Sequence, residues 1–158
     1  MSIATFLFTD IADSTEHVLR LGDARWDLLL ASYRATVRRE LHHFGGREVD
    51  AAGDGFFAIF PSPDGAVCCA RSISQDVQRL GLSSRTGVHS GPYQTGGEKV
   101  SGINVHVAAR VMAAARPGEV MLSEAVCNSL DSYGSGLSTA AAHALKGLPG
   151  EWPLYRAA

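Results

Sequence analysis

The order in which strand and helix patterns alternate is the feature of this sequence that most limits its possible folds. The patterns follow one another as strand, helix, strand, strand, helix and strand, at 4–9, 26–43, 47–52, 56–60, 63–80 and 84–89. Gly45 and Gly46 end the first helix, and Pro63 is a favoured first residue for the second. This order predicts a ferredoxin-like split βαβ core of the α+β class, in which helices cover one side of an antiparallel sheet.

The chain beyond residue 89 predicts a C-terminal extension of that core. Ser90, Gly91 and Pro92 are expected to close the last core strand. The elements expected after it are a helix, a short strand, a short helix and a Gly-rich β region, at 104–115, 119–122, 123–130 and 138–155. No linker or repeat interrupts the sequence, so we expect one domain over 1–158.

The composition is that of an ordinary globular domain. Its 158 residues are 46% hydrophobic and 19% charged, with a net charge of −2. This charge offers no basic surface for a nucleic acid, and the apolar run Ile3–Phe8 is too short for a signal peptide or a membrane span. The three cysteines lack metal-binding spacing and are interpreted as reduced thiols. We therefore expect a cytoplasmic protein with no membrane span in this chain.

Two aspartates lie where predicted elements of the core end. Asp10 follows the first strand, and Asp54 lies at the tip of the hairpin, between Gly53 and Gly55. The first strand of a split βαβ core lies beside that hairpin, so the two carboxylates can converge at one edge of the sheet. Such a pair suits two Mg²⁺ or Mn²⁺ ions roughly 3.5–4 Å apart. The alternative is that Asp10 caps the following helix and Asp54 is a turn residue.

Five segments of the chain carry a resemblance to a known family. They are 6–15 (FLFTDIADST), 52–60 (AGDGFFAIF), 85–91 (RTGVHSG), 104–110 (NVHVAAR) and 145–155 (LKGLPGEWPLY). Their content and order resemble the motifs of class III adenylyl/guanylyl cyclase catalytic domains and cover nearly the whole chain. The resemblance implies conversion of a nucleoside triphosphate into a 3′,5′-cyclic monophosphate and pyrophosphate, with two metal ions per site. It also implies a role in signal transduction.

The resemblance also implies roles for individual residues. Metal positions would be Asp10, Asp54 and Ile11, phosphate contacts Arg85, Lys146 and Thr15, and transition-state residues Arg110 and His106. Backbone amides over 12–15, at a helix start, would form an anion-binding nest. His106 stands where the family usually carries an asparagine that holds the ribose oxygen. Taken singly, each arginine could be a surface group and His106 a packed or exposed histidine, so these roles depend on the shared order of the motifs.

The two positions expected to read the base depart from the family pattern. Adenylyl cyclases usually carry a lysine and an aspartate where this chain has Asp50 and Lys99, so the two charges are exchanged. An acid at position 50 would accept hydrogen bonds from guanine, whereas adenine calls for the opposite arrangement. The alternative is that Asp50 and Lys99 pair with each other across a dimer interface and read nothing. The substrate is therefore left open between ATP and GTP.

The family's division of the site between two chains implies a partner. Metal carboxylates would come from one protomer and the base-reading and transition-state residues from the other, so we expect a head-to-tail homodimer with sites at the interface. A regulatory domain elsewhere in a longer protein would be usual. Two functions remain open: an active nucleotide cyclase, or a weak or silent cyclase-like domain that binds nucleotide or dimerises. A diguanylate cyclase is disfavoured because its characteristic acidic hairpin sequence is absent.

Overall fold

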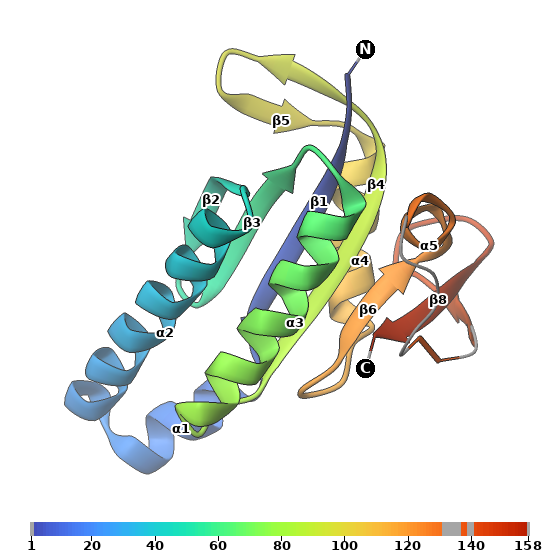
Figure 1. Cartoon of the computed structure of the whole chain (residues 1–158). Helices are drawn as coiled ribbons and strands as arrows, with labels where there is room; N and C mark the ends of the chain where they lie inside the picture. The colour runs from blue at the N-terminus through green and yellow to red at the C-terminus, as the bar shows by residue number, and fades with distance from the viewer. Residues whose placement is uncertain (1, 131–136, 139–140, 158) are drawn as a thin grey trace.

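A computed structural model describes residues 2–130, 137–138 and 141–157, and consists of a twisted sheet with helices on both faces (Figure 1). Its elements are β1 (Ser2–Ile11), α1 (Ser14–Leu21), α2 (Asp23–His43), β2 (Arg47–Ala52), β3 (Gly55–Phe60), α3 (Pro63–Arg79), β4 (Ser84–Gly96), β5 (Lys99–Ser101), α4 (Ile103–Ala113), β6 (Val120–Ser123), α5 (Glu124–Ser129), β7 (Ala141–Ala144) and β8 (Glu151–Ala157). The α+β class and the βαββαβ order of the core are confirmed.

The sheet places β1 at the centre of the predicted core. The strand order is β2-β3-β1-β4-β6-β8-β7, with β5 paired to β4. β1 pairs antiparallel with both β3 and β4, whereas β4 and β6 run parallel. The predicted convergence of β1 and the β2–β3 hairpin at one edge follows from this order.

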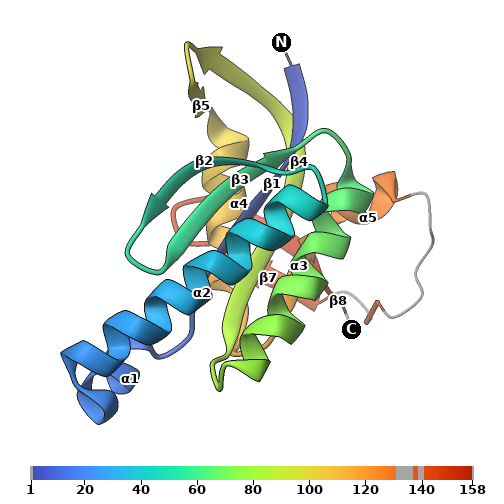
Figure 2. The ribbon, with the colours of Figure 1, turned by 60° about the vertical axis from the view of Figure 1, so that its left-hand side comes forward.

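The prediction that helices cover one side of the sheet is confirmed for the core helices α2 and α3, but α4 of the extension covers the other side, which was expected to be open. Leu7 of β1 belongs to the large core cluster with α2 and α3, whereas Phe6 packs in a different cluster with Ala108 of α4. Adjacent residues of a strand point to opposite faces, so α4 lies on the face opposite α2 and α3 (Figures 1 and 2). The helix was assigned to an extension of the chain, and sequence order alone did not show which face it would cover.

Three segments differ from their predicted form. β4 does not close at Ser90–Pro92: it continues to Gly96, because β1 pairs with it as far as Tyr93 and β5 folds back on its end. The helical region after β1 is two helices, α1 and α2, separated by Gly22, which has a positive φ of 81°. The final β region resolves into β7 and β8, and residues 139–140 of that prediction lie outside the described residues.

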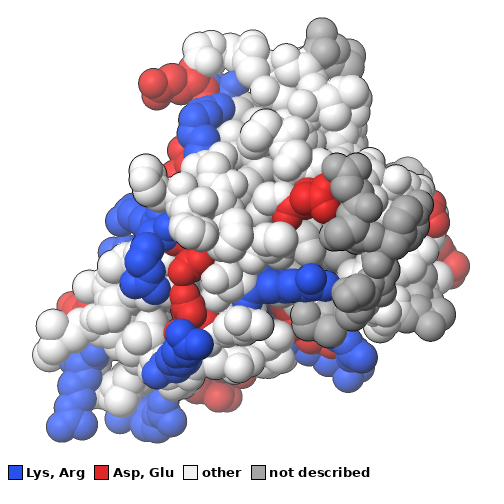
Figure 3. All heavy atoms as spheres, in the orientation of Figure 1, with Lys and Arg blue, Asp and Glu red and all other residues white. Residues whose placement is uncertain are grey.

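The outer face of α2 and α3 carries charges of both signs. Arg39 and Arg79 both contact Asp76, and Arg38 pairs with Glu48 of β2. Figure 3 shows acidic and basic side chains interspersed over this face instead of gathered into one patch. Within the described part of the chain, no helix is both long enough and apolar enough to cross a bilayer.

A glycine allows α4 to approach β4 closely. A Cβ atom built on Gly87 would lie 2.2 Å from the backbone nitrogen of Met112 and 2.6 Å from its Cα. These are main-chain atoms of α4, so no side-chain rotation could relieve the contact. Gly87 therefore sets the distance between the helix and the sheet.

A buried histidine ties this helix to two strands. His89 of β4 lies 2.6 Å (Nδ1) from Ser123 Oγ and 2.8 Å (Nε2) from Asn104 Oδ1. Asn104 donates its own amide to the carbonyl of Pro92 at 3.0 Å, which turns Oδ1 toward the histidine. Nε2 is therefore the protonated nitrogen, and Nδ1 accepts from the serine hydroxyl. Burial lowers the pKa of His89, and the bond to Asn104 opposes this shift only in part.

The lowered pKa of His89 predicts that acid destabilises the fold. Below the ordinary pKa of about 6.5, the unfolded chain takes up a proton that the folded chain resists, so the free energy of unfolding falls as pH falls. Urea unfolding at pH 7.5, 6.5 and 5.5 should show this loss, and His89→Gln should reduce the pH dependence. His42→Gln, at an exposed position of α2, is the control. A His89→Gln profile as steep as that of the wild type would contradict the assignment.

Candidate active site

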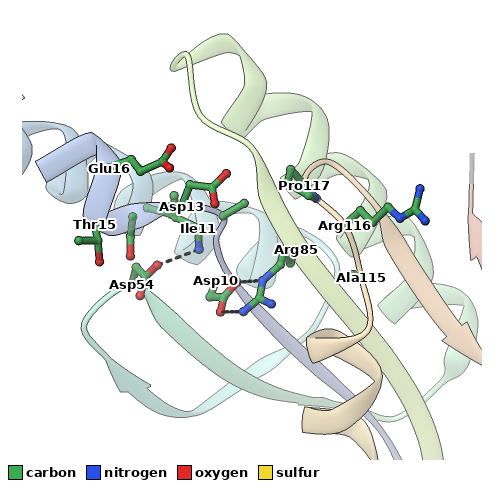
Figure 4. A pocket seen from close by; sticks show the side chains of 12 residues that line it. Asp10, Ile11, Asp13, Thr15, Glu16, Asp54, Arg85, Ala115, Arg116 and Pro117 are labelled. Atoms are coloured by element: carbon green, nitrogen blue, oxygen red, sulfur yellow. Dashed lines mark hydrogen bonds and ion pairs between the residues drawn. The ribbon is translucent and has the colours of Figure 1, made fainter. Parts of the chain in front are cut away.

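A cavity of about 630 Å³ lies where β1 ends beside the β2–β3 hairpin. Asp10, at the end of β1, and Asp54, at the hairpin tip, both line it, as do Ile11, Thr15 and Arg85 (Figure 4). The structure thus brings together five of the residues singled out from the sequence. They come from two strands, β1 and β4, the hairpin tip and the start of α1.

Asp10 forms a two-point ion pair with Arg85. Arg85 Nη2 donates to Asp10 Oδ2 at 2.6 Å and Nε to Oδ1 at 3.0 Å. The two residues are direct cross-strand partners in the β1–β4 ladder, so the sheet register fixes their meeting. Hydrogen bonding to Asp10 raises the pKa of Arg85. The arginine predicted to contact phosphate therefore rests on a carboxylate predicted to bind metal.

Asp54 is held from the other side of the cavity. Its Oδ2 accepts the backbone N–H of Ile11 at 2.9 Å, so the carboxylate turns toward the end of β1 (Figure 4). This contact joins the hairpin tip directly to the residue after Asp10. It also leaves the other carboxylate oxygen, Oδ1, outside that bond. The alternative that Asp10 caps the following helix is wrong, because Asp10 pairs with Arg85 and Asp13 precedes α1. Asp54 does lie in the hairpin turn, but its carboxylate also bonds to β1.

The helix start after β1 differs from its predicted role. Asp13 has a left-handed backbone (φ 57°) and makes no side-chain capping bond to α1. The amide of Ala12 donates to the carbonyl of Ser83 at 2.8 Å, which removes it from the predicted anion-binding nest over 12–15. The backbone amides of residues 13–15 remain available for such a nest.

Sequence reasoning missed three charged residues of the cavity wall. Asp13, Glu16 and Arg116 also line it. None of the three was assigned a role in the site from the sequence. The available signal was distance along the chain: Asp13 and Glu16 follow Asp10 closely, so they had to lie near it.

A second, smaller cavity lies on the α4 side of the same edge. It has a volume of about 220 Å³ and is lined by Asp50 together with Asp10 and Asp54. The rings of Phe8 and Phe57 stack at 4.4 Å and supply apolar wall. Asp50 itself is exposed, and its Oδ1 accepts the amide of Ala51 at 3.0 Å.

The remaining predicted site residues do not line either cavity. Lys99 lies on β5, His106 and Arg110 lie one turn apart on α4, and Lys146 lies in the turn between β7 and β8. All four are exposed. Within one chain, the acidic residues and the predicted transition-state residues are thus separate groups.

The sheet edge that carries Asp10 and Asp54 supplies some, but not all, of the ligands that a hard cation needs. Asp10 and Asp54 offer carboxylate oxygens, the ligands that Mg²⁺ and Mn²⁺ prefer. Among the described residues, no three histidine, cysteine, aspartate or glutamate side chains are grouped closely enough to hold an ion by themselves. Water and substrate oxygens would have to complete the coordination, as is usual for Mg²⁺.

The fold is that of nucleotide cyclase catalytic domains. The chain superimposes with a TM-score of 0.85 on the guanylate cyclase domain of RhGC from Catenaria anguillulae, solved in complex with GTP. The match covers 98% of this chain and 94% of the other, at 19% sequence identity. At that identity the likeness establishes architecture alone.

The chain belongs to the family of adenylate and guanylate cyclase catalytic domains, whose family model matches residues 1–156. It is 29% identical to an adenylate cyclase of Lachancea kluyveri, over 77% of this chain and 8% of that protein. It is also 29% identical to an uncharacterised protein of Mycobacterium tuberculosis, over 94% of this chain. The chain spans 53% of the length of the mycobacterial relative.

Proposed function

We propose that this chain is a nucleotide cyclase that converts ATP or GTP into its 3′,5′-cyclic monophosphate and pyrophosphate. The observation that carries the proposal is the convergence of Asp10 and Asp54 on one cavity in a domain of this family. Mg²⁺ or Mn²⁺ bound there would activate the attacking 3′-oxygen and neutralise charge on the leaving phosphates.

The residues of the chain then serve to bind and orient the triphosphate. No protein nucleophile is required, because the substrate's own hydroxyl attacks the α-phosphorus. Arg85, once released from Asp10, is placed to donate to phosphate oxygens beside Thr15. Arg110 offers a planar donor fork for charge on the α-phosphate, and Lys146 a compact charge for the outer phosphates.

The two groups of site residues support a shared site in a dimer. Because the exposed residues of α4 and Lys146 lie outside the cavity of their own chain, a second copy is the natural source of both for that cavity. We propose a head-to-tail homodimer in which each chain completes the other's site.

Mixing inactive variants tests the shared site. Asp10→Ala and Arg110→Ala chains should each be inactive, whereas co-expressed in equal amounts they should regain about a quarter of wild-type activity. Half of randomly formed dimers are mixed, and each mixed dimer keeps one of its two sites. Co-expressed chains no more active than either variant alone would rule out a site built from two chains.

The proposal has two versions, which differ in whether the substrate is ATP or GTP. Asp50, exposed beside the small cavity, carries an acceptor suited to guanine N1–H and the 2-amine. Incubating the protein with ATP and with GTP separately, each with Mn²⁺, and separating the products by chromatography measures the preference. No cyclic product from either nucleotide at high protein concentration would overturn the proposed activity.

A weak or silent cyclase-like domain is the second candidate. The exchanged charges at Asp50 and Lys99, and the histidine at position 106, favour it because each alters a contact expected for substrate. Nucleotide with Mn²⁺ should then raise the melting temperature, by binding the folded state, while no cyclic product forms.

The Arg85–Asp10 ion pair predicts competition between arginine and metal. Arg85→Ala frees Asp10, so Mn²⁺ measured without nucleotide should bind about 3- to 10-fold more tightly, in line with the loss of a charged hydrogen-bonded pair. Turnover should nevertheless fall, because a phosphate contact is lost. Arg116→Ala, also in the cavity wall, should leave metal affinity within twofold, a range typical of changes outside the pair. Weaker Mn²⁺ binding in Arg85→Ala would contradict the competition.

A further inference from the structure

Helix α2 contacts the hairpin that carries Asp54 at its tip. Tyr33 donates its hydroxyl to the main-chain carbonyl of Asp54 at 2.8 Å. Arg34, the next residue, donates twice to the carbonyl of Gly53, at 3.0 Å from Nε and 2.6 Å from Nη2. Both views of the ribbon place α2 beside β2 and β3 (Figures 1 and 2). Two consecutive helix residues thus hold two consecutive residues of the tip.

The Tyr33 donor is built into the core. The side chain is fully buried, and its ring packs at a tilt against Phe56 of β3, with centroids 6.0 Å apart. Burial raises the pKa of Tyr33, and the nearby charges of Asp54 and Asp10 raise it further. The packing of the ring therefore fixes the direction in which the hydroxyl donates to the Asp54 carbonyl.

The tip itself needs such support. Gly53 has a left-handed backbone (φ 59°), and beyond the Ala52–Gly55 pair no ladder bond fixes the two tip residues. The carboxylate of Asp54 reaches Ile11 only if the tip is turned toward β1. A loosened tip would let Asp54 move away from Asp10, and a metal pair depends on both.

We infer that Tyr33 and Arg34 are positioning residues for the metal site, holding the backbone at Gly53 and Asp54 so that the Asp54 carboxylate faces Asp10. This inference rests on the proposed function for its catalytic meaning, but the geometry it describes can be measured without turnover. Neither residue touches the cavity, so neither is a catalytic residue.

Arg38 supplies a matched comparison on the same helix. It lies one turn beyond Arg34, and its guanidinium pairs with Glu48 at 2.9 Å and lies over the ring of Phe56. It therefore packs on the body of the hairpin, and its hydrogen bonds go to Glu48 and not to the tip. A change at Arg38 should loosen packing without moving Asp54.

The backbone amide of Ile11 reports the position of Asp54 in metal-free protein. Its acceptor is the Asp54 carboxylate, so loss of the tip contacts should speed its hydrogen exchange, measured by NMR. We expect about tenfold faster exchange in Tyr33→Phe and in Arg34→Ala, an intermediate rate in Arg34→Lys, and a wild-type rate in Arg38→Ala. An unchanged Ile11 rate in both Tyr33→Phe and Arg34→Ala would overturn the inference, as would an equal increase in Arg38→Ala.

Metal affinity gives the second measurement. Mn²⁺ binding is followed by electron paramagnetic resonance in the presence of 3′-deoxy-ATP or 3′-deoxy-GTP, which lack the attacking hydroxyl and cannot be cyclised. Tyr33→Phe and Arg34→Ala should bind Mn²⁺ about 3- to 10-fold more weakly than wild type, and Arg38→Ala equally well. A wild type that binds Mn²⁺ but releases no product with ATP or GTP would sink the proposed activity alone. A wild type that binds no Mn²⁺ would sink both proposals.

Discussion

Asp54→Asn is expected to lower the rate of cyclic nucleotide formation about a thousandfold while leaving the fold intact. Losing a metal-bound charge removes several kcal/mol of transition-state stabilisation, and each 1.36 kcal/mol is about tenfold in rate. The substitution is conservative in shape. The Tyr33 hydroxyl bonds to the main-chain oxygen of residue 54, which Asn retains, and an amide oxygen can still accept from Ile11. The variant therefore removes charge with little loss of geometry.

The measurement is kcat with Mn²⁺ and the preferred triphosphate, together with the urea midpoint of the same preparation. Asp27→Asn, an exposed acid on α2 away from the cavity, is the control and should keep wild-type kcat. A kcat for Asp54→Asn within tenfold of wild type would show that the carboxylate is not a required ligand. The two-metal proposal would then fail.

Gly87→Ala is expected to destabilise the domain by about 3 kcal/mol, the upper range for overpacking a well-packed interior. The added Cβ would meet Met112 nitrogen at 2.2 Å, so β4 and α4 must separate along their contact. Because α4 carries His106 and Arg110, this separation should also displace both from their positions relative to the sheet. The free energy of unfolding is measured in urea, and an unchanged slope against urea would show that the unfolded state is unaffected.

Gly96→Ala is the matched control for this change. Gly96 ends the same strand, and a Cβ there would meet nothing within 4 Å. Its effect should stay within about 0.5 kcal/mol, as for most surface substitutions. If both alanine variants lost equal stability, the cost would reflect strand propensity and not the approach of α4.

The core order and the acidic edge could be predicted from the sequence because both depend on local signals. Glycines, Pro63 and apolar periodicity mark element ends within a few residues, and β2 was predicted with its observed bounds, 47–52. The extension of β4 to Gly96 could not be predicted, because it depends on pairing with β1, more than 80 residues earlier. The face covered by α4 likewise depends on long-range packing at Gly87.

For the candidate site, the sequence predicted the two carboxylates but not the contacts that they make. Asp10 and Asp54 were found because each stands where a strand or hairpin ends, and such positions meet at a sheet edge. The ion pair of Asp10 with Arg85 was missed because register, not spacing, makes residues 10 and 85 cross-strand partners. The contact of Tyr33 with residue 54 was missed because α2 reads from the sequence only as an apolar stripe.

The hydrogen bonds from α2 to main-chain oxygens have a consequence for how such a domain can change during evolution. The hydrogen bonds from α2 to the hairpin tip use main-chain acceptors that every amino acid possesses, whereas the proposed metal binding there needs the Asp54 carboxylate. A lineage could therefore lose Asp54 by a single base change, keep the same fold and lose the proposed activity. Such a descendant would keep the contacts that shape the hairpin tip without the proposed chemistry.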